Sequence, residues 1–363
     1  MKITIQKNDV ANIKKILKTK ENANEVYIRC DANNTYFTVK NDNDDKVTVI
    51  TSPAKSENKY VRPNFAIIAN KTKLLNCIRN SNNYVVLAFE NAGEMKVISA
   101  EKSMIEVVDT VEYISCDYAV FNHYSQEAEI TLRNFNSIVK KVEFAISNEN
   151  CRENLHCVNF KITQEKVFAM ATNTRIGTIF EVGNNSNSAE PQQFVIKTNI
   201  LELIKKSESL EVSKENSDKK RYLKTKEFIV EVNCKGDFPE LFETAIQNHE
   251  GRETMGTLEM HASDTVYFRN FDSKKKITIE KVGENRVKIS QENKQIIARN
   301  IQLKDTDYLE INSGSINNAI TAIFNGTGKV VAEIKQETMF INTAKQKTII
   351  VLVRDKKAQA EAA

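Results

Sequence analysis

Cysteine and histidine are the residues of this chain best suited to hold a metal, and their spacing does not favour one. Six cysteines and four histidines are scattered along 363 residues, and no two cysteines form Cys-x-x-Cys. Cys151, His156 and Cys157 stand close enough to suggest a metal cluster. Since no second ligand pair has zinc spacing, scattered reduced thiols are the preferred interpretation.

Catalytic carboxylates are also not arranged for chemistry. Asp42, Asp44 and Asp45 lie together in NDNDDK, but this string lacks the glycine and distal glutamate of a calcium loop, so it predicts a solvated hairpin tip. The sequence holds no Gly-x-Ser-x-Gly, Walker loop or His-Glu-x-x-His motif. A nucleic-acid enzyme would also need a carboxylate cluster for Mg²⁺. We therefore predict that the protein is not an enzyme and uses no metal or cofactor.

Lysine and arginine are the chemically suggestive residues, because they recur opposite apolar helical stripes. In residues 132–143, Phe135, Ile138 and Val142 repeat at helical spacing, with basic residues on the other side. The outward faces of helices are commonly charged. Here the outward faces of four predicted helices all carry positive charge and few carboxylates, which favours contact with phosphate. The residues predicted to contact it are Lys7, Lys14, Lys15, Lys18, Lys71, Lys73, Arg79, Arg133, Lys140, Lys141, Lys197, Lys205 and Lys206.

The expected contact is independent of base sequence and sensitive to salt. The net charge of +4 is too mild to imply nucleic acid by itself, so the placement of the lysines carries the argument. The basic residues are also unevenly distributed among the repeats. In the third repeat, the segment SINNAITAIF has no basic residue, and Arg269 stands alone before the lysine cluster 274–276.

The elements that position these residues occur three times. Strand, polar cap and helix are predicted in that order at 3–17, 130–144 and 258–271, and again at 65–80, 194–207 and 309–324. A strand follows each of the second helices. The fold class is α+β, with antiparallel sheets and helices on one face. The predicted domains are 1–124, 125–247 and 248–355, and residues 356–363 are an expected disordered tail.

Between the two helices of each repeat, the sequence predicts a strand pair around a polar tip. In the second repeat this pair is VFAMATNTRIGTIF, residues 167–180. Asn173 and Thr174 suit a turn, because their side chains bond nearby backbone groups.

The chain resembles a bacterial DNA sliding clamp, the beta subunit of the replicative DNA polymerase III. The resemblance covers essentially the whole chain and depends on the triple repeat, on ATNTRIG, on GDFPELF (236–242) and on the apolar strand KTIIVLVRD near the end. It implies a ring of two chains, with helices lining a channel around duplex DNA. It also adds Arg152 to the predicted DNA-contacting residues.

The resemblance further implies a pocket in which polymerase and clamp-loader subunits insert short apolar peptides. The residues carried over to this pocket are Leu155, Thr172, Thr174, Arg175, Ile176, Pro239, Val351, Leu352 and Val353. The chain departs from the family pattern here: its tip is one residue shorter, the usual Met-Pro-Met-Arg-Leu ending is absent, and Glu243 stands where a basic residue is common. An altered peptide preference is therefore expected.

Ring closure requires two edges that pair between chains. The segment 102–111 is the candidate on one side, and the region around Val266 and Phe268 on the other. The residues predicted for the dimer interface are Met104, Ile105, Val107, Val266 and Phe268. The alternative for Met104 and Ile105 is a simple place in the core.

Composition suggests a cytoplasmic protein with no membrane contact, and the resemblance implies that it is a processivity factor of DNA replication. The mean hydropathy is −0.45, and no apolar segment follows the first lysine or is long enough to cross a bilayer. The alternative function is a monomeric, clamp-like interaction adaptor that never encloses DNA.

Overall fold

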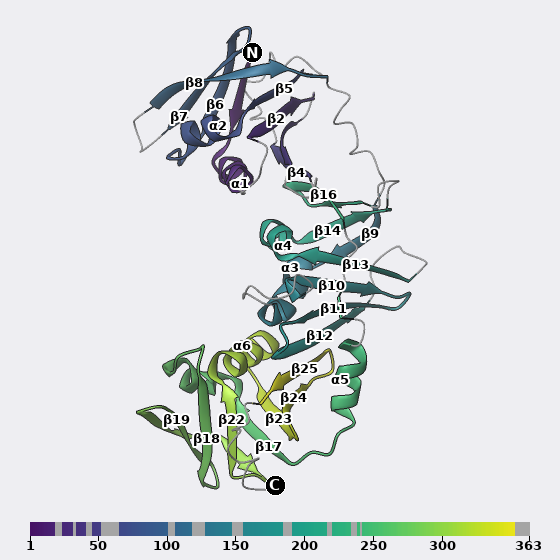
Figure 1. Ribbon diagram of the computed structural model, residues 1–363, viewed down its shortest axis with the longest axis vertical. Helices are drawn as coiled ribbons and strands as arrows, with labels where there is room; N and C mark the ends of the chain where they lie inside the picture. Colours follow the sequence, from purple (N-terminus) through teal and green to yellow (C-terminus); the bar gives the residue numbers. More distant parts are fainter. Residues whose placement is uncertain are drawn as a thin grey trace. The chain divides into compact units, whose positions relative to one another are not determined.

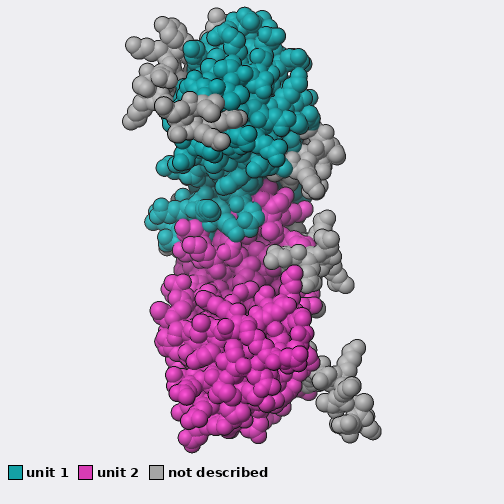
Figure 2. Space-filling model, turned by 90° about the vertical axis from the view of Figure 1, so that its left-hand side faces the viewer, with its two compact units in different colours: residues 1–135, 186–188, 202–234 teal, residues 136–185, 189–201, 235–363 magenta. Residues whose placement is uncertain are grey.

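The structure, a computed structural model, describes residues 1–18, 24–31, 34–40, 46–51, 65–100, 106–117, 128–146, 155–183, 191–215, 220–233, 238–239 and 242–352. These residues form two compact units, shown in Figure 2. One unit comprises residues 1–135 and 202–233, and the other comprises 136–183, 191–201 and 238–352. None of the described helices has the length and apolar character needed to cross a membrane.

The division between the units runs through the second repeat. The predicted domain boundaries near residues 124 and 247 stay a prediction. Residues 118–127 lie outside the described part of the chain, and residue 247 lies inside helix α5 (Phe242–Glu250).

The first unit holds one antiparallel sheet, in which twelve strands are described (Figure 1). Its strands carry β-branched and aromatic residues in alternation, so that one face is buried. In spatial order they are β1 (Lys2–Ile5), β6 (Val85–Asn91), β7 (Glu94–Ala100), β8 (Glu106–Ser115), β5 (Phe65–Asn70), β2 (Glu25–Cys30), β3 (Thr35–Lys40), β4 (Lys46–Thr51), β16 (Phe228–Val232), β15 (Arg221–Lys224), β14 (Ser209–Ser213) and β9 (Ala128–Arg133).

This sheet continues without interruption from the first repeat into the second. Strand β4 pairs with β16, placing Val49 opposite Phe228 and Lys46 opposite Glu231. The Lys46 ammonium lies 2.9 Å from the Glu231 carboxylate, which is nearly buried. Shared strand pairing explains why the chain needs no long glycine- or proline-rich linker between these repeats.

Two helices cover the first repeat, as the sequence predicts. Helix α1 (Lys7–Leu17) buries Val10, Ile13 and Ile16, and helix α2 (Lys71–Ile78) buries Leu74 and Ile78. The Asn70 side chain accepts a hydrogen bond of 2.9 Å from the Lys73 backbone N–H, which caps α2.

The second unit holds two antiparallel sheets, of nine and four described strands. The larger contains β13 (Gln192–Lys197), β10 (Cys157–Ile162), β11 (Lys166–Thr172), β12 (Ile176–Gly183), β25 (Gln346–Val351), β24 (Thr338–Asn342), β23 (Lys329–Lys335), β17 (Gly256–His261) and β21 (Gln302–Lys304). The smaller contains β20 (Lys294–Arg299), β19 (Arg286–Gln291), β18 (Lys276–Gly283) and β22 (Tyr308–Asn312).

The nine-stranded sheet joins the second repeat to the third. Strand β12 pairs with β25, which sets Ile176 opposite Ile350 and Thr178 opposite Thr348. The two threonine hydroxyls lie 2.8 Å apart, and Gln346 Nε2 donates to Thr178 Oγ1 at 3.0 Å. The predicted hairpins of all three repeats are confirmed as β3–β4, β11–β12 and β19–β20.

The helices of the second and third repeats follow the predicted order, with one difference of type. They are α3 (Phe135–Val142), η3 (Glu143–Ala145), α4 (Thr198–Ile204), η5 (Ala262–Asn270) and α6 (Ser313–Phe324). The first helix of the third repeat, η5, is a 3₁₀ helix, whose first turn is closed by a capping box between His261 and Asp264. Helix α5 is not predicted from the sequence, because only Phe242 and Ile246 give it an apolar stripe.

Candidate nucleic-acid interface and partner-binding pocket

The helices expose most of the basic residues that the sequence marks for phosphate contact. On α1, Lys7, Lys15 and Lys18 are exposed, whereas the apolar side of the helix is buried. In the other repeated elements, the exposed members of the predicted set are Lys73 and Lys140 on helices, Arg79 and Lys206 just after helices, and Arg133 and Lys197 at the ends of strands β9 and β13. Arg152 lies outside the described residues.

Several members of the predicted set, among them Lys14, Lys71 and Lys205, have side chains that are buried or already engaged. Lys14 Nζ donates to the carbonyl oxygen of Ser81. The pKa of Lys14 is lowered, mainly by burial and to a lesser extent by the nearby positive charge of Lys18. Lys71 is only 6% exposed. Lys205 lies 2.8 Å from the carboxylate of Glu202. These residues are less available to a phosphate than the exposed set.

Lys140 and Lys141 are sequence neighbours in different surroundings. Lys140 is exposed, whereas Lys141 Nζ donates to the carbonyl oxygens of Ala322 and Ile323 at 2.7 and 2.8 Å. These carbonyls belong to the last turn of α6, which has no intrahelical donor for them. Burial lowers the pKa of Lys141. Lys141 therefore caps a helix of the third repeat, and Lys140 remains free to face solvent.

The tip of the β11–β12 hairpin is held by its own side chains. Asn173 Oδ1 accepts from the backbone N–H groups of Arg175 and Ile176 at 3.0 and 2.8 Å. Thr172 Oγ1 donates to the Ile176 carbonyl at 2.9 Å. Thr174 has a φ of +72°, which is unfavourable for a β-branched residue. The tip is therefore a tight, strained turn with Thr174 and Arg175 exposed.

Strand β25 brings the end of the described chain against this tip. The Val351 N–H donates to the Arg175 carbonyl at 2.8 Å, and Val351 is 42% exposed. Thr172, Thr174, Arg175, Ile176 and Val351 thus come together as the pocket prediction requires, with Leu352 next along the chain.

The remaining predicted pocket residues differ in exposure. Leu155 and Ile176 are 5% and 4% exposed, so both are covered by this chain itself. Pro239 is half-buried, and its carbonyl accepts from the Phe242 N–H at 3.0 Å. Val353 lies outside the described residues.

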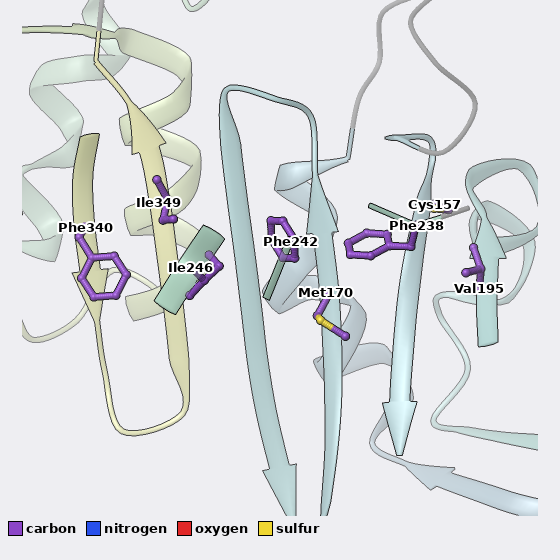
Figure 3. Close-up of a cluster of buried hydrophobic side chains, with 8 residues drawn as sticks. All are labelled: Cys157, Met170, Val195, Phe238, Phe242, Ile246, Phe340 and Ile349. Carbon is purple, nitrogen blue, oxygen red and sulfur yellow. The ribbon is translucent and has the colours of Figure 1, made fainter. Parts of the chain in front are cut away.

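A buried apolar cluster lies beside the tip, between helix α5 and the sheet. Figure 3 shows its side chains following one another across the sheet from β24 to β13. Its members are Cys157, Met170, Val195, Phe238, Phe242, Ile246, Phe340 and Ile349. Gly177 makes room for it, because a Cβ there would lie 2.6 Å from the Phe242 ring. The sequence signal that could have revealed this contact is a glycine inside a strand.

Glu243, which departs from the family pattern, forms an ion pair on α5. Lys161 Nζ of β10 lies 2.8 Å from Glu243 Oε1, with both side chains about two-fifths exposed. The pair links α5 to the same sheet that bears the hairpin tip.

Each described sheet ends in strands that have a neighbour on one side only, and two of the open edges in the described residues lie on β8 and β20. In β8, residues 106–112 pair only with β7, since β5 reaches β8 only at 113–115. The second edge is β20, which pairs only with β19. Val108 is 60% exposed and Ile297 is 55% exposed on these edges.

The predicted interface residues are distributed unevenly. Val107 is half-buried on β8, and Val266 is 53% exposed on η5. Phe268 is 1% exposed and lies in the core. Met104 and Ile105 lie outside the described residues.

No group of three or more His, Cys, Asp or Glu side chains in the described part of the chain could hold a metal ion. The expectation of no metal stays a prediction, because Cys151 lies outside that part.

No protein-family model matches this sequence, and no curated protein matches it. Solved structures do match. The Bacillus subtilis DNA polymerase sliding clamp has a TM-score of 0.74 and 14% identity, over 98% of this chain and 99% of that chain. For the Borrelia burgdorferi DNA polymerase III subunit beta, the TM-score is 0.74 and the identity 14%, over 98% of both chains. For the Pseudomonas aeruginosa DNA polymerase III subunit beta, the TM-score is 0.71 and the identity 12%, over 98% of this chain and 100% of that chain.

These comparisons establish the fold. The chain has the α+β fold of the DNA polymerase III beta subunit, so the resemblance drawn from the sequence is confirmed at the level of the fold.

Proposed function

We propose that this protein is a DNA sliding clamp, a non-catalytic processivity factor that encircles duplex DNA and tethers replication proteins to it. The observation that carries the proposal is the match of nearly the whole chain to sliding clamps. A repeat-built ring needs all of its repeats, and the match leaves out almost none of the chain.

DNA contact in this proposal comes from the exposed lysines and arginines of the first two repeats. Lysine is a flexible point charge that binds phosphate without reading a base. Weak contacts of this kind suit a ring that holds DNA by topology and must slide. Lys140, Lys197 and Lys206 are representative members, because each is exposed at or beside a helix end.

Ring closure in this proposal joins β8 of one chain to β20 of its partner. Both are open edges with exposed apolar residues, and their charges are complementary. Strand β8 carries Glu106, Asp109 and Glu112, whereas β20 carries Lys294 and Arg299. A head-to-tail contact of this kind closes into a ring of two chains when the rotation allows it.

Partner binding in this proposal occurs at the β11–β12 tip. Arg175, Thr174 and Val351 provide an exposed polar and apolar surface there, and a partner peptide would place a Leu or Phe side chain against Val351 and Leu352. Buried Leu155 and Ile176 would support this surface from below.

DNA retention tests the central claim. The clamp is loaded onto nicked circular DNA, and the fraction that remains is measured after gel filtration, before and after linearisation. We expect retention on the circle and loss from the linear form. Lys140→Glu, Lys197→Glu and Lys206→Glu together should reduce retention severalfold. The matched control reverses three exposed lysines of the third repeat, Lys274, Lys281 and Lys345. Equal retention on circular and linear DNA would contradict encirclement.

Solution mass tests the ring. Light scattering over a dilution series should give about twice 41.3 kDa for the wild-type chain, and the Ile297→Asp variant should shift towards the monomer. A wild-type monomer at every concentration would favour the non-encircling adaptor, an alternative that agrees with the lack of basic residues in α6.

The partner site is tested with two valines of equal exposure on different strands. Val351→Asp should abolish binding of a short peptide that carries adjacent Leu and Phe residues, measured by fluorescence anisotropy. Val331→Asp is the control, because Val331 is 40% exposed on β23. Unchanged binding by Val351→Asp would place the peptide site elsewhere.

A further inference from the structure

A hollow of about 640 Å³ lies between helix α3 of the second repeat and helix α6 of the third. Both helices belong to the same compact unit. The hollow is lined from α3 and η3 by Ser137, Lys140, Lys141, Glu143 and Phe144, and from η5 and α6 by Arg269, Asn317, Asn318, Thr321, Ala322 and Asn325. Helix α6 has no lysine or arginine, and its hydrogen-bond donors in the hollow are the side chains of Asn317, Asn318 and Thr321.

Four charged side chains line the hollow. Lys140 and Arg269 are exposed cations, and Glu143 is the only carboxylate among the lining residues. The carboxyl end of α6 adds partial negative charge, which Lys141 offsets by donating to the Ala322 and Ile323 carbonyls. After this cancellation the side chains of Lys140 and Arg269 leave an excess of one positive charge over Glu143.

Amide and hydroxyl groups complete the lining. Arg269 Nε donates to Asn317 Oδ1 at 3.3 Å, which holds the guanidinium beside α6 and leaves its terminal N–H groups for another acceptor. Asn317 Nδ2 in turn donates to Asn318 Oδ1 at 3.4 Å.

Thr321 adds an independent observation. Its Oγ1 is buried and has no hydrogen-bond partner among the described residues. Buried polar groups without a partner are uncommon in folded proteins and call for an explanation. Thr321 itself lines the hollow, so a rotation about its χ1 would present this hydroxyl to an oxygen-rich ligand there.

We infer that this hollow seats a backbone phosphate of duplex DNA between Lys140 of the second repeat and Arg269 of the third. The inference depends on the proposed function for the identity of the ligand. Phosphate oxygens in protein–DNA complexes accept from arginine, lysine, asparagine and threonine side chains, which are the groups gathered here. The third repeat therefore contributes through one arginine and a row of amides instead of a lysine face.

Salt dependence of DNA binding provides the test. Affinity for a fluorescein-labelled duplex is measured by anisotropy over a range of salt concentrations, with the full-length protein. Each lost phosphate contact reduces the slope of log K against log salt by about one. Arg269→Gln should make this negative slope shallower by about one. Asn317→Asp, which keeps the side-chain shape but adds a negative charge, should weaken binding severalfold at low salt.

Matched controls are available outside the hollow. Arg286→Gln removes an exposed arginine on β19, and Asn342→Asp adds a carboxylate at the one exposed residue of β24. Both should bind DNA as the wild type does. Circular dichroism of each variant confirms that it is folded.

Three outcomes separate this inference from the proposed function. A reduced slope for Lys140→Gln with wild-type values for Arg269→Gln and Asn317→Asp would overturn the phosphate seat and keep the clamp. Wild-type slopes for Lys140→Gln, Lys197→Gln and Lys206→Gln would contradict the proposed DNA contact itself. Equal weakening by Asn342→Asp and Asn317→Asp would show a general charge effect and would also overturn the seat.

Discussion

The ammonium nitrogen of Lys141 lies 2.7 Å from the carbonyl oxygen of Ala322, although the two residues are 181 positions apart in the chain. Beside it, Gln346 Nε2 donates to the Lys141 carbonyl at 2.6 Å. Lys141 is thus bonded through both its side chain and its backbone to the third repeat, and the pairing of β12 with β25 continues the same junction.

Replacing Lys141 with methionine should destabilise the protein. The variant keeps the aliphatic stem but removes the donor to two terminal carbonyls of α6, and a charged hydrogen bond in a partly exposed place is worth about 1–2 kcal/mol. Urea unfolding followed by circular dichroism measures the effect. Lys140→Met is the control and should change stability by less than about 0.5 kcal/mol, because Lys140 is exposed. Equal midpoints for the two variants would contradict the capping role.

Gly177→Ala should destabilise the hairpin through a clash with α5. The new Cβ would lie 2.6 Å from Phe242 Cε2, and Phe242 is held in the apolar cluster of Figure 3, so the cost is about 1–3 kcal/mol. Gly183→Ala, at the far end of the same strand, is the control, since its Cβ would meet nothing within 4 Å. Adding Phe242→Leu to Gly177→Ala should recover part of the loss, and strictly additive effects would argue against the clash.

Thr174→Gly should stabilise the protein by about 1 kcal/mol. The left-handed backbone at Thr174 costs a non-glycine residue about 1–2 kcal/mol, and the greater freedom of unfolded glycine cancels only part of that gain. Arg175→Gly, one residue later and without a positive φ, should have the opposite sign. Thermal unfolding of the two variants checks the prediction, and a loss of stability in Thr174→Gly would show that the turn is not strained.

Two buried thiols should resist alkylation at alkaline pH. Burial raises the pKa of Cys157 to about 11, and burial likewise raises that of Cys30 to about 11, against a weak opposing hydrogen bond with Thr35. At pH 9 the native protein should therefore react slowly with iodoacetamide at both positions, and peptide mass mapping would show it. Half-buried Cys116 should be labelled sooner.

The same shift has a consequence for stability. The unfolded thiols ionise at lower pH than the buried ones, so the unfolded state loses protons first as the pH rises. The free energy of unfolding should decrease between about pH 9 and 11. Rapid native labelling of Cys157 would contradict its burial.

Sequence periodicity is sufficient to predict the repeated strands and helices, but not the helix α5 that packs against them. The alternation in residues 167–180 predicts a hairpin, and β11 and β12 form it with the expected polar tip. Helix α5 escaped prediction, because two apolar residues four positions apart are a weak helical signal and its stability comes from packing on the sheet.

The basic residues show the same limit more clearly. Helical spacing predicts which lysines face away from the core, and Lys140 is exposed as expected. It cannot predict that Lys141 finds carbonyl acceptors on α6 or that Lys71 is buried, since those partners come from residues distant in sequence.

The shared strand pairings have a mechanical consequence. A force that separates the repeats would have to break the backbone ladders between β4 and β16 and between β12 and β25, four and five residue pairs that share the load. In the proposed ring, the contact between separate chains at the β8 and β20 edges would have no covalent continuity to reinforce it. Under tension, the weakest joints of an assembled ring would therefore lie between its chains, and the repeats within each chain would move as linked pieces.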